Sequence, residues 1–546
     1  MQLTIGPRMA PVAPLLAGIW IVFAQFALVL SVFPAINTDA SSLSYGHSSA
    51  PLFESARVLP LELEIAPDGL ASLRKDRRRP VTGWVRQGTT IYSNVFIHLK
   101  GTRGSVRSID DKPSFTLQFA AGSPAHQFYG LRKIHLNNAV EDPTYLNQGL
   151  GSHLFHTAGI ATPRTTYASV RLGSRRLGIY VLQEGLTEEY VADRYPGAGV
   201  LLFEPGRGQD VDQVLVPKWE NSEAWATFFA RLDQALRADP VSERWNQLSE
   251  IVDLDQFVTF MAMEIILGHR DGYCLARNNF RLALDRARGR FFWVPYGMDQ
   301  LLGNPKAVLV PSMAGRLAEA VMRTPEGQAR YRRKCEQLVA EVFQPGPIAT
   351  WIQNQARVLE PWLSWRELSS FRREVADLEQ RVYDRRAFLD RQLAEPELRP
   401  VSWREGETLL ENWTPRDVPD GGKLDRPQVE DGLSVLRVVA GSRTAASWRS
   451  KVLLSAGHYR FQGRVRTSGV EPLLFGARNG AALRVADLTL ERIPTVLGDS
   501  PWTPLEVTFR VVGEPRVFEM VCELRARRGE AWFDLRTLRL VKLPDY

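Results

Sequence analysis

Residues 269–300 constrain the fold of this chain most, because they read as a β-hairpin with polar side chains at one end. A strand is predicted over residues 280–284, a turn at Arg288 and Gly289, and a returning strand over residues 291–294. Antiparallel strands return to the edge from which they start, so residues that enter the hairpin lie close to residues that leave it. The polar residues placed there are Asp271, Asn278, Asn279 and Asp299.

Carboxylate and amide oxygens gathered in this way suit a hard cation such as Mg²⁺, which commonly shares phosphate oxygens with a nucleotide. Aspartate and asparagine are also ordinary turn formers that cap the ends of strands. On these residues alone, a metal site and a set of strand caps are therefore both open.

The composition is that of a large folded protein. At roughly 150 residues per domain, 546 residues suggest about three domains, and 44% hydrophobic with 24% charged residues is typical of a globular chain. The net charge of +7 is spread out, and the basic run at residues 74–79 has no interleaved aromatic side chains, so no nucleic-acid partner is expected. The three cysteines are far apart, which indicates neither a disulfide framework nor a zinc site.

The N-terminal segment predicts export. Residues 15–33 carry no charge, and at about 1.5 Å per residue they nearly cross a hydrocarbon core of about 30 Å. This length favours an uncleaved signal anchor within residues 1–37 over a cleaved signal peptide, with residues 38–58 as a tether. We therefore expect a protein anchored to the cytoplasmic membrane and facing the periplasm or the cell exterior, or secreted if the segment is cleaved.

A glycine-rich, basic loop at residues 101–113 separates two predicted strands, residues 92–100 and 114–119. The loop ends at Lys112, and it offers backbone donors and an ammonium group that suit a phosphate. It does not match the P-loop spacing, so a plain hairpin loop is the alternative.

A second hairpin, predicted over residues 168–184, ends in Glu184. The strand before Glu184 is apolar, and an unpaired buried carboxylate is costly, so this residue needs a cationic partner. Lys112 is the candidate partner.

Two helices are predicted beside the central hairpin. Residues 253–268 read as a buried helix that leads into the polar cluster. Later in the chain Phe371, Val375, Leu378 and Val382 recur at helical spacing, so a long amphipathic helix is expected to pack on the same lobe.

Taken in order, these motifs resemble the CotH family of secreted atypical protein kinases, first known from spore coats. The resemblance runs from about residue 59 to residue 395. It rests on the KPSF motif that starts at Lys112, the HLNN motif followed by Asp142, the YVLQE motif that ends at Glu184, and the segments around Asp271 and Asp299. It implies a divergent protein-kinase-like lobe, built of a mixed sheet plus helices, that binds ATP and Mg²⁺ (or Mn²⁺).

The resemblance also implies roles for the polar residues of the hairpin. Asp271 matches the catalytic aspartate of the family, and Asp299 matches its metal-binding aspartate. Asn279, or its neighbour Asn278, matches a metal-binding amide.

Lys112 would hold the nucleotide phosphates, and Glu184 would pair with that lysine. The family commonly carries an aspartate-x-aspartate pair at the second turn, whereas this chain has Gly297 in place of the first aspartate. Loss of that ligand would weaken metal binding or leave a nucleotide-binding pseudokinase. Arg103 and Arg107 in the basic loop are expected to compensate in part by meeting phosphate.

From residue 396 the chain changes to short alternating segments separated by Gly, Pro and Asp, which predicts an antiparallel β-sandwich over residues 396–546. Residues 447–467 and 531–543 are similar to jelly-roll carbohydrate-binding modules, which implies a carbohydrate ligand. Three tryptophans there either stack on sugar rings or fill the core: Trp448, Trp502 and Trp532. The fold class expected for the chain is α+β, a kinase-like lobe followed by a jelly-roll-like sandwich.

The function expected first is that of an exported, membrane-tethered kinase that transfers the γ-phosphate of ATP to a hydroxyl of a protein (Ser/Thr) or of a surface glycan. The alternative is a non-catalytic pseudokinase that acts in assembly of an extracellular matrix or polysaccharide. A glycoside hydrolase would need two carboxylates across a sugar cleft, and the asparagines and lysine around the cluster suit phosphate better.

Overall fold

The computed structural model describes residues 49–54, 56–102, 104–119, 127–195, 197, 199–213, 215–219, 225–395, 401–416, 422–429, 432–474, 479–486, 488, 493–512 and 515–544. The predicted signal anchor, most of the predicted tether and Arg103 lie outside these residues. Within the part that is described, no helix is both long and apolar enough to cross a membrane. The chain divides into two compact units, Met1–Leu393 and Ala394–Tyr546.

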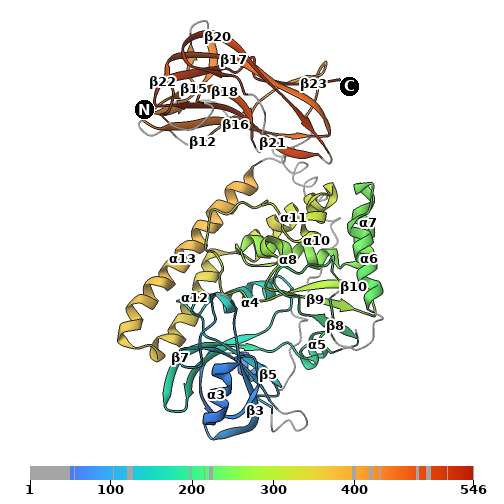
Figure 1. Ribbon diagram of the computed structural model, residues 1–546, viewed down its shortest axis with the longest axis vertical. Helices are drawn as coiled ribbons and strands as arrows, with labels where there is room; N and C mark the ends of the chain where they lie inside the picture. The colour runs from blue at the N-terminus through green and yellow to red at the C-terminus, as the bar shows by residue number, and fades with distance from the viewer. Residues whose placement is uncertain are drawn as a thin grey trace, which may run out of the picture. The chain divides into compact units, whose positions relative to one another are not determined.

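The first unit begins with a closed β-barrel (Figure 1) whose strand order is β1-β2-β3-β4-β5-β7-β6. β1 pairs parallel with β6, and the other neighbours are antiparallel. The strands predicted over residues 92–100 and 114–119 and the hairpin predicted over residues 168–184 are confirmed. The bounds of the barrel strands are β1 (Val58–Ile65), β2 (Val81–Gln87), β3 (Thr90–Lys100), β4 (Ser114–Gln118), β5 (Lys133–Asn137), β6 (Thr165–Leu172) and β7 (Arg175–Glu184).

One face of this barrel is polar where β3, β4, β5 and β7 lie side by side. Alternation along a strand sends every second side chain to the apolar interior, which includes Leu99 and Phe115. The opposite face carries a row of register partners, His98, Thr116, His135 and Gln183. Because side chains two residues apart share a face, Lys100, Lys133 and Asn137 lie on this polar face too.

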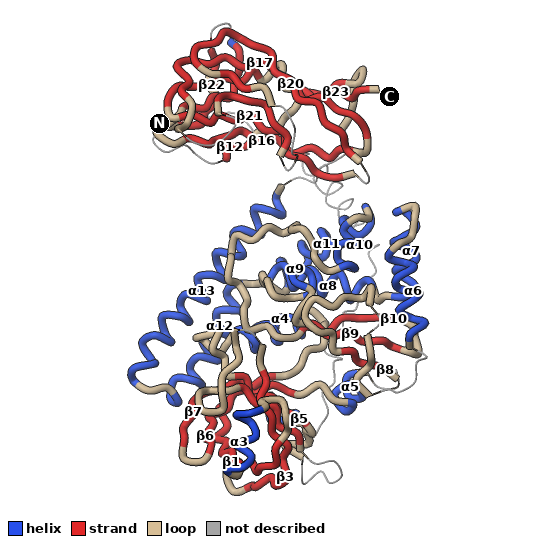
Figure 2. The backbone as a smooth tube through the Cα atoms, in the orientation of Figure 1, coloured by secondary structure: helices blue, strands red, loops and turns tan. Residues whose placement is uncertain are grey.

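A second sheet of order β10-β9-β8 follows, surrounded by helices (Figure 2). It contains the predicted hairpin, with β9 (Phe280–Asp285) paired antiparallel to β10 (Arg290–Pro295), and β8 (Val200–Phe203) at its edge. The helices of this unit are α2 (Ala50–Phe53), α3 (Pro67–Lys75), α4 (Asn147–Thr157), α5 (Glu188–Arg194), α6 (Ala226–Leu236), α7 (Val241–Ile251), α8 (Leu254–Ile266), α9 (Tyr273–Ala276), α10 (Arg316–Met322), α11 (Pro325–Glu341), α12 (Pro345–Leu359), the 3₁₀ helix η3 (Glu360–Trp362) and α13 (Trp365–Ala394).

The two helices predicted beside the hairpin are confirmed. α8 is buried along nearly its whole length, and α13 buries the predicted stripe from Phe371 to Val382 in the same core. A fully buried arginine joins them, because Arg385 of α13 donates to the carbonyls of Ile265 and Ile266 at 2.8 and 2.9 Å. The guanidinium therefore binds carbonyls of the last turn of α8, where helical hydrogen bonding runs out, and it fixes the helix end that precedes Asp271.

The second unit consists of two sheets around its own core. One has the order β11-β23-β17-β22-β15-β13, with β14 on β15 and β20 on β17, and the other has the order β12-β16-β21-β18-β19. Trp448 is 4% exposed within this core, so it fills the interior. The bounds are β11 (Glu407–Leu409), β12 (Thr414–Arg416), β13 (Lys423–Asp425), β14 (Gln428–Val429), β15 (Leu433–Val439), β16 (Thr444–Leu454), β17 (Gly457–Glu471), β18 (Gly480–Val485), β19 (Thr495–Val496), β20 (Gly498–Val511), β21 (Arg516–Ala526), β22 (Arg528–Asp534) and β23 (Arg539–Leu543).

Candidate active site

The structure brings the polar residues at the start of the hairpin together around one carboxylate. Asn278 and Asn279 donate from Nδ2 to Oδ2 of Asp271 at 2.8 and 3.0 Å. The chain reaches this arrangement through left-handed backbone at Arg277 and Asn279, with φ of 50° and 45°. Non-glycine residues adopt such values rarely, and asparagine does so more readily than most, so the sequence Asn278-Asn279 suits the turn.

A buried carboxylate holds the segment that carries Asp271. Glu264 of α8 is fully buried and accepts hydrogen bonds from the backbone N–H groups of Tyr273 and Cys274 at 2.9 and 2.8 Å. His269 lies 3.6 Å from Glu264, and its Nε2 lies 3.2 Å from the carbonyl of Gly297. Burial acts to lower the pKa of His269, but its contacts with Glu264 outweigh burial and raise that pKa. His269 thus links the two ends of the hairpin.

The second turn of the site is held by the first turn of α4. Asn147 donates from Nδ2 to the carbonyl of Asp299 at 3.1 Å, and Gln148 accepts from the N–H of Met298 at 2.8 Å. Asp142, which the sequence places at a helix start, accepts from the N–H of Asn147 at 2.8 Å and so fixes that turn of α4. The side chain of Asp299 is therefore positioned by backbone contacts on both sides.

A third carboxylate lies within electrostatic range of the first two. Glu141 accepts a hydrogen bond from Gln300 at 3.0 Å, and burial, followed by the charges of Asp299 and Asp271, raises its pKa. Burial also raises the pKa of Asp299, and Asp271 adds to that increase. Sequence reasoning missed Glu141, because the adjacent Asp142 carried the visible helix-start signal.

These residues fit a divalent cation. Mg²⁺ prefers oxygen ligands and usually takes only one or two protein carboxylates, the rest being water and phosphate. Asp271, Asp299 and Asn279 supply such oxygens. Burial raises the pKa of Glu141 and of Asp299, and the charge of Asp271 adds a repulsion to both that a cation would relieve. In the described part of the chain, however, no three His, Cys, Asp or Glu side chains form a ready-made metal cage.

Four cations lie close enough that the charges of three of them act on the fourth, Lys133, and we call them the cationic cluster. They are Lys100, Lys133, Lys218 and Arg281. Lys100 donates to Oδ1 of Asn137 at 2.7 Å, and its charge acts to lower the pKa of Asp299. Burial, followed by the charge of Lys218, lowers the pKa of Lys133 to about 8.

Among the described residues, Glu204 is the one carboxylate whose charge acts on Lys133. Lys218 and Arg281 lie 2.8 and 3.4 Å from it, and the Arg281 guanidinium lies 4.0 Å from the centre of the Tyr296 ring. Four cations against one carboxylate leave an excess of positive charge that suits a polyphosphate.

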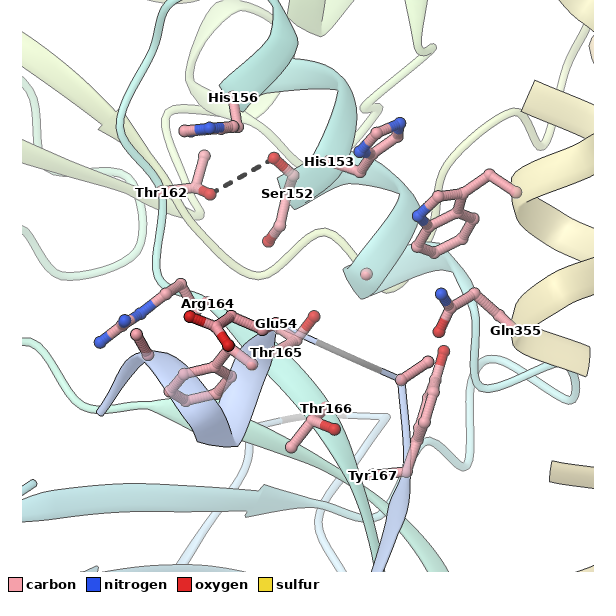
Figure 3. Close-up of a pocket in the computed structure, with 15 residues that line it drawn as sticks. Glu54, Ser152, His153, His156, Thr162, Arg164, Thr165, Thr166, Tyr167 and Gln355 are labelled. Carbon is pink, nitrogen blue, oxygen red and sulfur yellow. Dashed lines mark hydrogen bonds between the residues drawn. The ribbon is translucent and has the colours of Figure 1, made fainter. Parts of the chain in front are cut away.

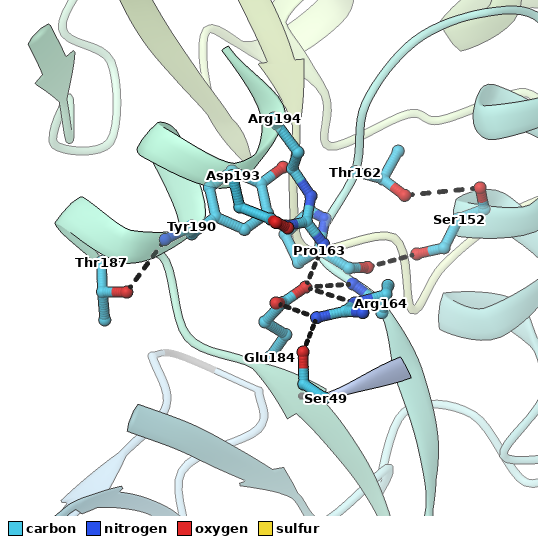
Figure 4. Close-up of polar contacts among 10 residues, drawn as sticks. All are labelled: Ser49, Ser152, Thr162, Pro163, Arg164, Glu184, Thr187, Tyr190, Asp193 and Arg194. Atoms are coloured by element: carbon cyan, nitrogen blue, oxygen red, sulfur yellow. Dashed lines mark hydrogen bonds and ion pairs between the residues drawn. The ribbon is translucent and has the colours of Figure 1, made fainter. Parts of the chain in front are cut away.

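The predicted pair between Lys112 and Glu184 is wrong. Glu184 binds two arginines (Figure 4), with Oε1 2.6 Å from Nη2 of Arg164 and Oε2 2.8 Å from Nη2 of Arg194. The Lys112 ammonium instead lies 3.4 Å from the Tyr145 hydroxyl. The reason is the strand order: β5 separates β7, which carries Glu184, from β4, which follows Lys112.

The environment of Lys112 is aromatic. Its ammonium lies 5.0 and 5.3 Å from the ring centres of Tyr145 and Tyr180. Burial lowers its pKa to about 8, although Glu367 and Asp111 act in the opposite direction. Lys100 is among the charges that act on Asp299 and Lys112 is not, so the structure places Lys100, and not Lys112, beside the turn of Asp299.

Arg107 lies on the side of the site where Glu141 is found. It donates to the carbonyls of Gly104 and Val106 at 2.9 and 2.8 Å, and its charge acts to lower the pKa of Glu141. A Cβ on Gly104 would overlap the Glu141 carboxylate, so the basic loop lies against the acidic cluster. Its other arginine, Arg103, lies outside the described residues.

A separate pocket of about 610 Å³ lies between α2, α4, α12 and the start of β6 (Figure 3). His153 stacks on Trp351 at its wall, with ring centres 5.5 Å apart. Arg164 lines the pocket and also binds Glu184. None of the site residues predicted from sequence lines it.

Gly297 cannot be replaced by the acidic residue of the family without strain. Its φ is 59°, and an added Cβ would lie 2.5 Å from Oδ1 of Asn279. We expect Gly297→Asp to destabilise the first unit by about 1–3 kcal/mol and to give no increase in metal-dependent nucleotide binding, as measured by thermal unfolding and by calorimetry. Gly297→Asp combined with Asn279→Gly should recover part of the stability; equal stability of the two variants would contradict the clash.

The chain is similar in sequence to the inner spore coat protein H of Bacillus subtilis (strain 168), at 21% identity over 192 residues that cover 32% of this chain and 52% of that protein. It spans about half the length of the curated relatives it matches. The Helicobacter pylori proinflammatory kinase CtkA is a similar solved structure, at 7% identity and a TM-score of 0.26 over 51% of this chain and 94% of that one. Another is the CBM22-1–GH10 part of the Clostridium thermocellum endo-1,4-β-D-xylanase 10B complexed with xylohexaose, at 12% identity and a TM-score of 0.19 over 25% of this chain and 27% of that one.

A family model described as CotH kinase protein matches residues 100–389. The match contains Lys112, Glu184, Asp271 and Asp299, and it covers more than half of the chain. The protein therefore belongs to the CotH kinase protein family.

Proposed function

We propose that this protein is an atypical kinase that transfers the γ-phosphate of ATP to a hydroxyl group of a protein or of a surface glycan, with Mg²⁺ or Mn²⁺ as cofactor. The observation that carries the proposal is one arrangement: Asp271 held by two asparagine amides, with Asp299 on one side and the cationic cluster beyond it. Phosphoryl transfer depends mainly on positioning and on neutralisation of charge, and this arrangement offers both.

Asp271 is the residue we assign as the general base. Both amide hydrogen bonds go to Oδ2, and among the described residues no hydrogen bond to Oδ1 is found. Oδ1 would accept the proton of the acceptor hydroxyl. The oxygen of that hydroxyl would bond to the γ-phosphorus, while the bond between the γ-phosphorus and the bridging oxygen of the β-phosphate breaks and ADP is released. The two asparagine amides hold the carboxylate in orientation.

Asp299 and Asn279 are the residues we assign to the metal. A bound Mg²⁺ would neutralise charge on the β- and γ-phosphates. Asn147 and Gln148 keep the turn of Asp299 in place, so the metal ligand would be positioned before the nucleotide binds. Glu141 would lie beside it through water or directly, because its pKa already responds to Asp299.

The test is a transfer assay on the purified chain with ATP labelled on the γ-phosphate, in the presence of Mg²⁺ or Mn²⁺ and a generic protein acceptor. Metal-dependent labelling supports a kinase. Metal-dependent binding of ATP without any transfer supports the alternative, a pseudokinase that acts in assembly of a matrix or polysaccharide. That alternative is favoured by Gly297, which supplies no carboxylate and leaves no room for one. Absence of nucleotide binding would contradict both.

Lys100, and not Lys112, is proposed to hold the nucleotide phosphates. Lys100 lies in the cationic cluster beside Asp299, whereas Lys112 lies against Tyr145 and Tyr180. We expect Lys100→Met to weaken ATP binding by about tenfold or more, because a charge-assisted hydrogen bond contributes roughly 1.5–3 kcal/mol. Lys112→Met is the matched control and should change the dissociation constant less than threefold in calorimetry; the reverse order would restore the phosphate role to Lys112.

Export and membrane anchoring are part of the proposal. They are supported by the uncharged residues 15–33. An exported kinase needs a phosphate donor outside the cytoplasm, so the physiological donor is a question for the transfer assay with alternative nucleotides. Two measurements test the location. Protease added to intact cells should degrade the chain, and in untreated cells the chain should be recovered in the membrane fraction.

The second unit is proposed to bind carbohydrate. The support comes from two tryptophans that lie outside its main core, Trp502 and Trp532, in contrast to the core residue Trp448. Tryptophan offers a large apolar face with one polar edge, which suits a ring that is both apolar and hydroxylated.

A further inference from the structure

The strand β17 has one face in the core of the second unit and one face outside it. Tyr459, Phe461 and Val465 are buried in the core, whereas the alternate residues from Arg460 to Arg466 are exposed or half-buried. Because side chains alternate along a strand, Gln462, Arg464 and Arg466 share the outer face, and so does Trp532 of the neighbouring strand β22, which pairs with Arg466.

Four side chains on this outer face form an alternating stack of indole and guanidinium groups. The Arg466 guanidinium lies 4.5 Å from the ring centre of Trp532 and 5.8 Å from that of Trp502, and the Arg464 guanidinium lies 5.9 Å from Trp502. Trp532 is 7% exposed and packs with Leu433 and Trp502 in a small cluster separate from the main core. Trp502 and the arginines above it are more accessible.

The positive charge of this stack is only partly neutralised. Arg464 lies 2.5 Å from the fully buried carboxylate of Asp534. For Arg466, no carboxylate of the described residues lies within ion-pair distance. Guanidinium groups stacked on indoles keep their in-plane N–H donors directed outward, so Arg466 presents hydrogen-bond donors beside an aromatic face.

A hollow of about 500 Å³ adjoins Arg464. Gln462 and Arg539 line it and add amide and guanidinium donors, and Glu506 is the carboxylate on its wall. Arg539 is paired with Glu407 at 2.8 Å. The hollow and the stack share Arg464, so they form one surface in which hydrogen-bond donors lie beside the aromatic side chains of the stack.

We propose that this outer face binds an acidic polysaccharide, one whose sugar rings carry carboxylate groups, with the rings against Trp502 and the carboxylates on Arg466 and Arg464. The inference rests on the proposed carbohydrate-binding role of the second unit and adds the charge of the ligand. A planar guanidinium matches a carboxylate with two parallel hydrogen bonds. A neutral sugar would cover Arg466 without supplying a counter-charge, and that costs free energy.

The test compares two polymers of the same backbone, polygalacturonate and its fully methyl-esterified form, in affinity electrophoresis and calorimetry with the full chain. The expected result is binding of polygalacturonate, weakening as salt rises, and at least tenfold weaker binding of the esterified polymer. Arg466→Gln and Trp502→Ala should each weaken binding about tenfold or more. Lys451→Gln, on β16 in the other sheet of the unit, removes the same charge and should leave binding unchanged.

Arg466→Lys separates charge from geometry. It keeps the charge but loses the planar fork, so it should also weaken binding. Equal binding of both polymers would overturn the acidic ligand while the carbohydrate-binding role stands. If folded wild-type protein, checked by circular dichroism, bound neither polymer, both the acidic ligand and the carbohydrate-binding role would be overturned. Equal binding of polyglutamate, or no effect of Trp502→Ala, would show a general polyanion surface and would also overturn the proposal.

Discussion

Replacing Asp271 by asparagine is expected to lower phosphate transfer from ATP by about 10²–10⁴-fold, the usual contribution of a positioned acid or base. The side chain keeps its size, and an amide oxygen accepts the hydrogen bonds of Asn278 and Asn279 as the carboxylate does. Nucleotide binding should therefore change less than threefold. The measurement is the initial rate of transfer of labelled γ-phosphate at saturating ATP and metal, with binding followed separately by calorimetry.

The control is Asp285→Asn, at the far end of the same hairpin, where the carboxylate caps the N–H of Arg288 at 3.0 Å. It makes the same chemical change on the same pair of strands and should leave transfer within twofold of wild type. Asp299→Asn should behave differently from both, because loss of the proposed metal ligand would weaken the metal dependence of ATP binding itself. A fully active Asp271→Asn protein would remove this residue from the mechanism.

The hairpin was predictable because its information is local. Period-two alternation fixes β9 and β10, and the turn between them then brings Asp271, Asn278, Asn279 and Asp299 to one end without any knowledge of the rest of the fold. The helix stripe of α13 is local in the same sense, and its burial follows the spacing of its apolar residues. The element against which each helix or strand packs is not encoded in its local sequence.

The cationic side of the site shows that limit. Lys100 and Lys133 lie on the same face only because β3, β4 and β5 are neighbours in the barrel, and strand order cannot be read from alternation. The predicted pair between Lys112 and Glu184 was wrong for the same reason. The two side chains suit each other chemically, but Lys112 precedes β4 and Glu184 ends β7, and these strands are not neighbours. Arg164, one of the two arginines that bind Glu184, precedes β6, which pairs directly with β7.

For the tryptophans of the second unit, the sequence does not show which face of the strand each side chain occupies. Around Trp532 three large or apolar residues follow one another, Ala531, Trp532 and Phe533, so the pattern does not say which of them faces the core. The structure gives Ala531 and Phe533 to the main core and Trp532 to the outer cluster. The core interpretation is therefore confirmed for Trp448, whereas Trp532 lies outside the main core and stacking on sugar rings stays a prediction.

Glu184→Gln is expected to destabilise the first unit by about 3–5 kcal/mol, the cost of removing one partner from a buried ion pair. Glu184 is 2% exposed, and the Arg164 and Arg194 side chains that share its carboxylate are 8% and 1% exposed. The glutamine keeps the shape and one acceptor oxygen but removes the counter-charge of two desolvated guanidinium groups. The measurement is urea unfolding of the full chain, in which the second unit, with its own core, provides an unchanged transition for reference.

The matched control is Glu189→Gln on α5, whose partner is Arg132 and whose side chain is 48% exposed. A solvent-exposed pair contributes roughly 0–1 kcal/mol, so this variant should unfold within that range of the wild type. Glu184 ends β7, and Arg194 belongs to α5, so the same ion pair joins the barrel to the chain that follows it. If Glu184→Gln unfolded at the same urea concentration as Glu189→Gln, the two arginines would be solvated well enough without the carboxylate, and the pair would carry no net stability across that junction.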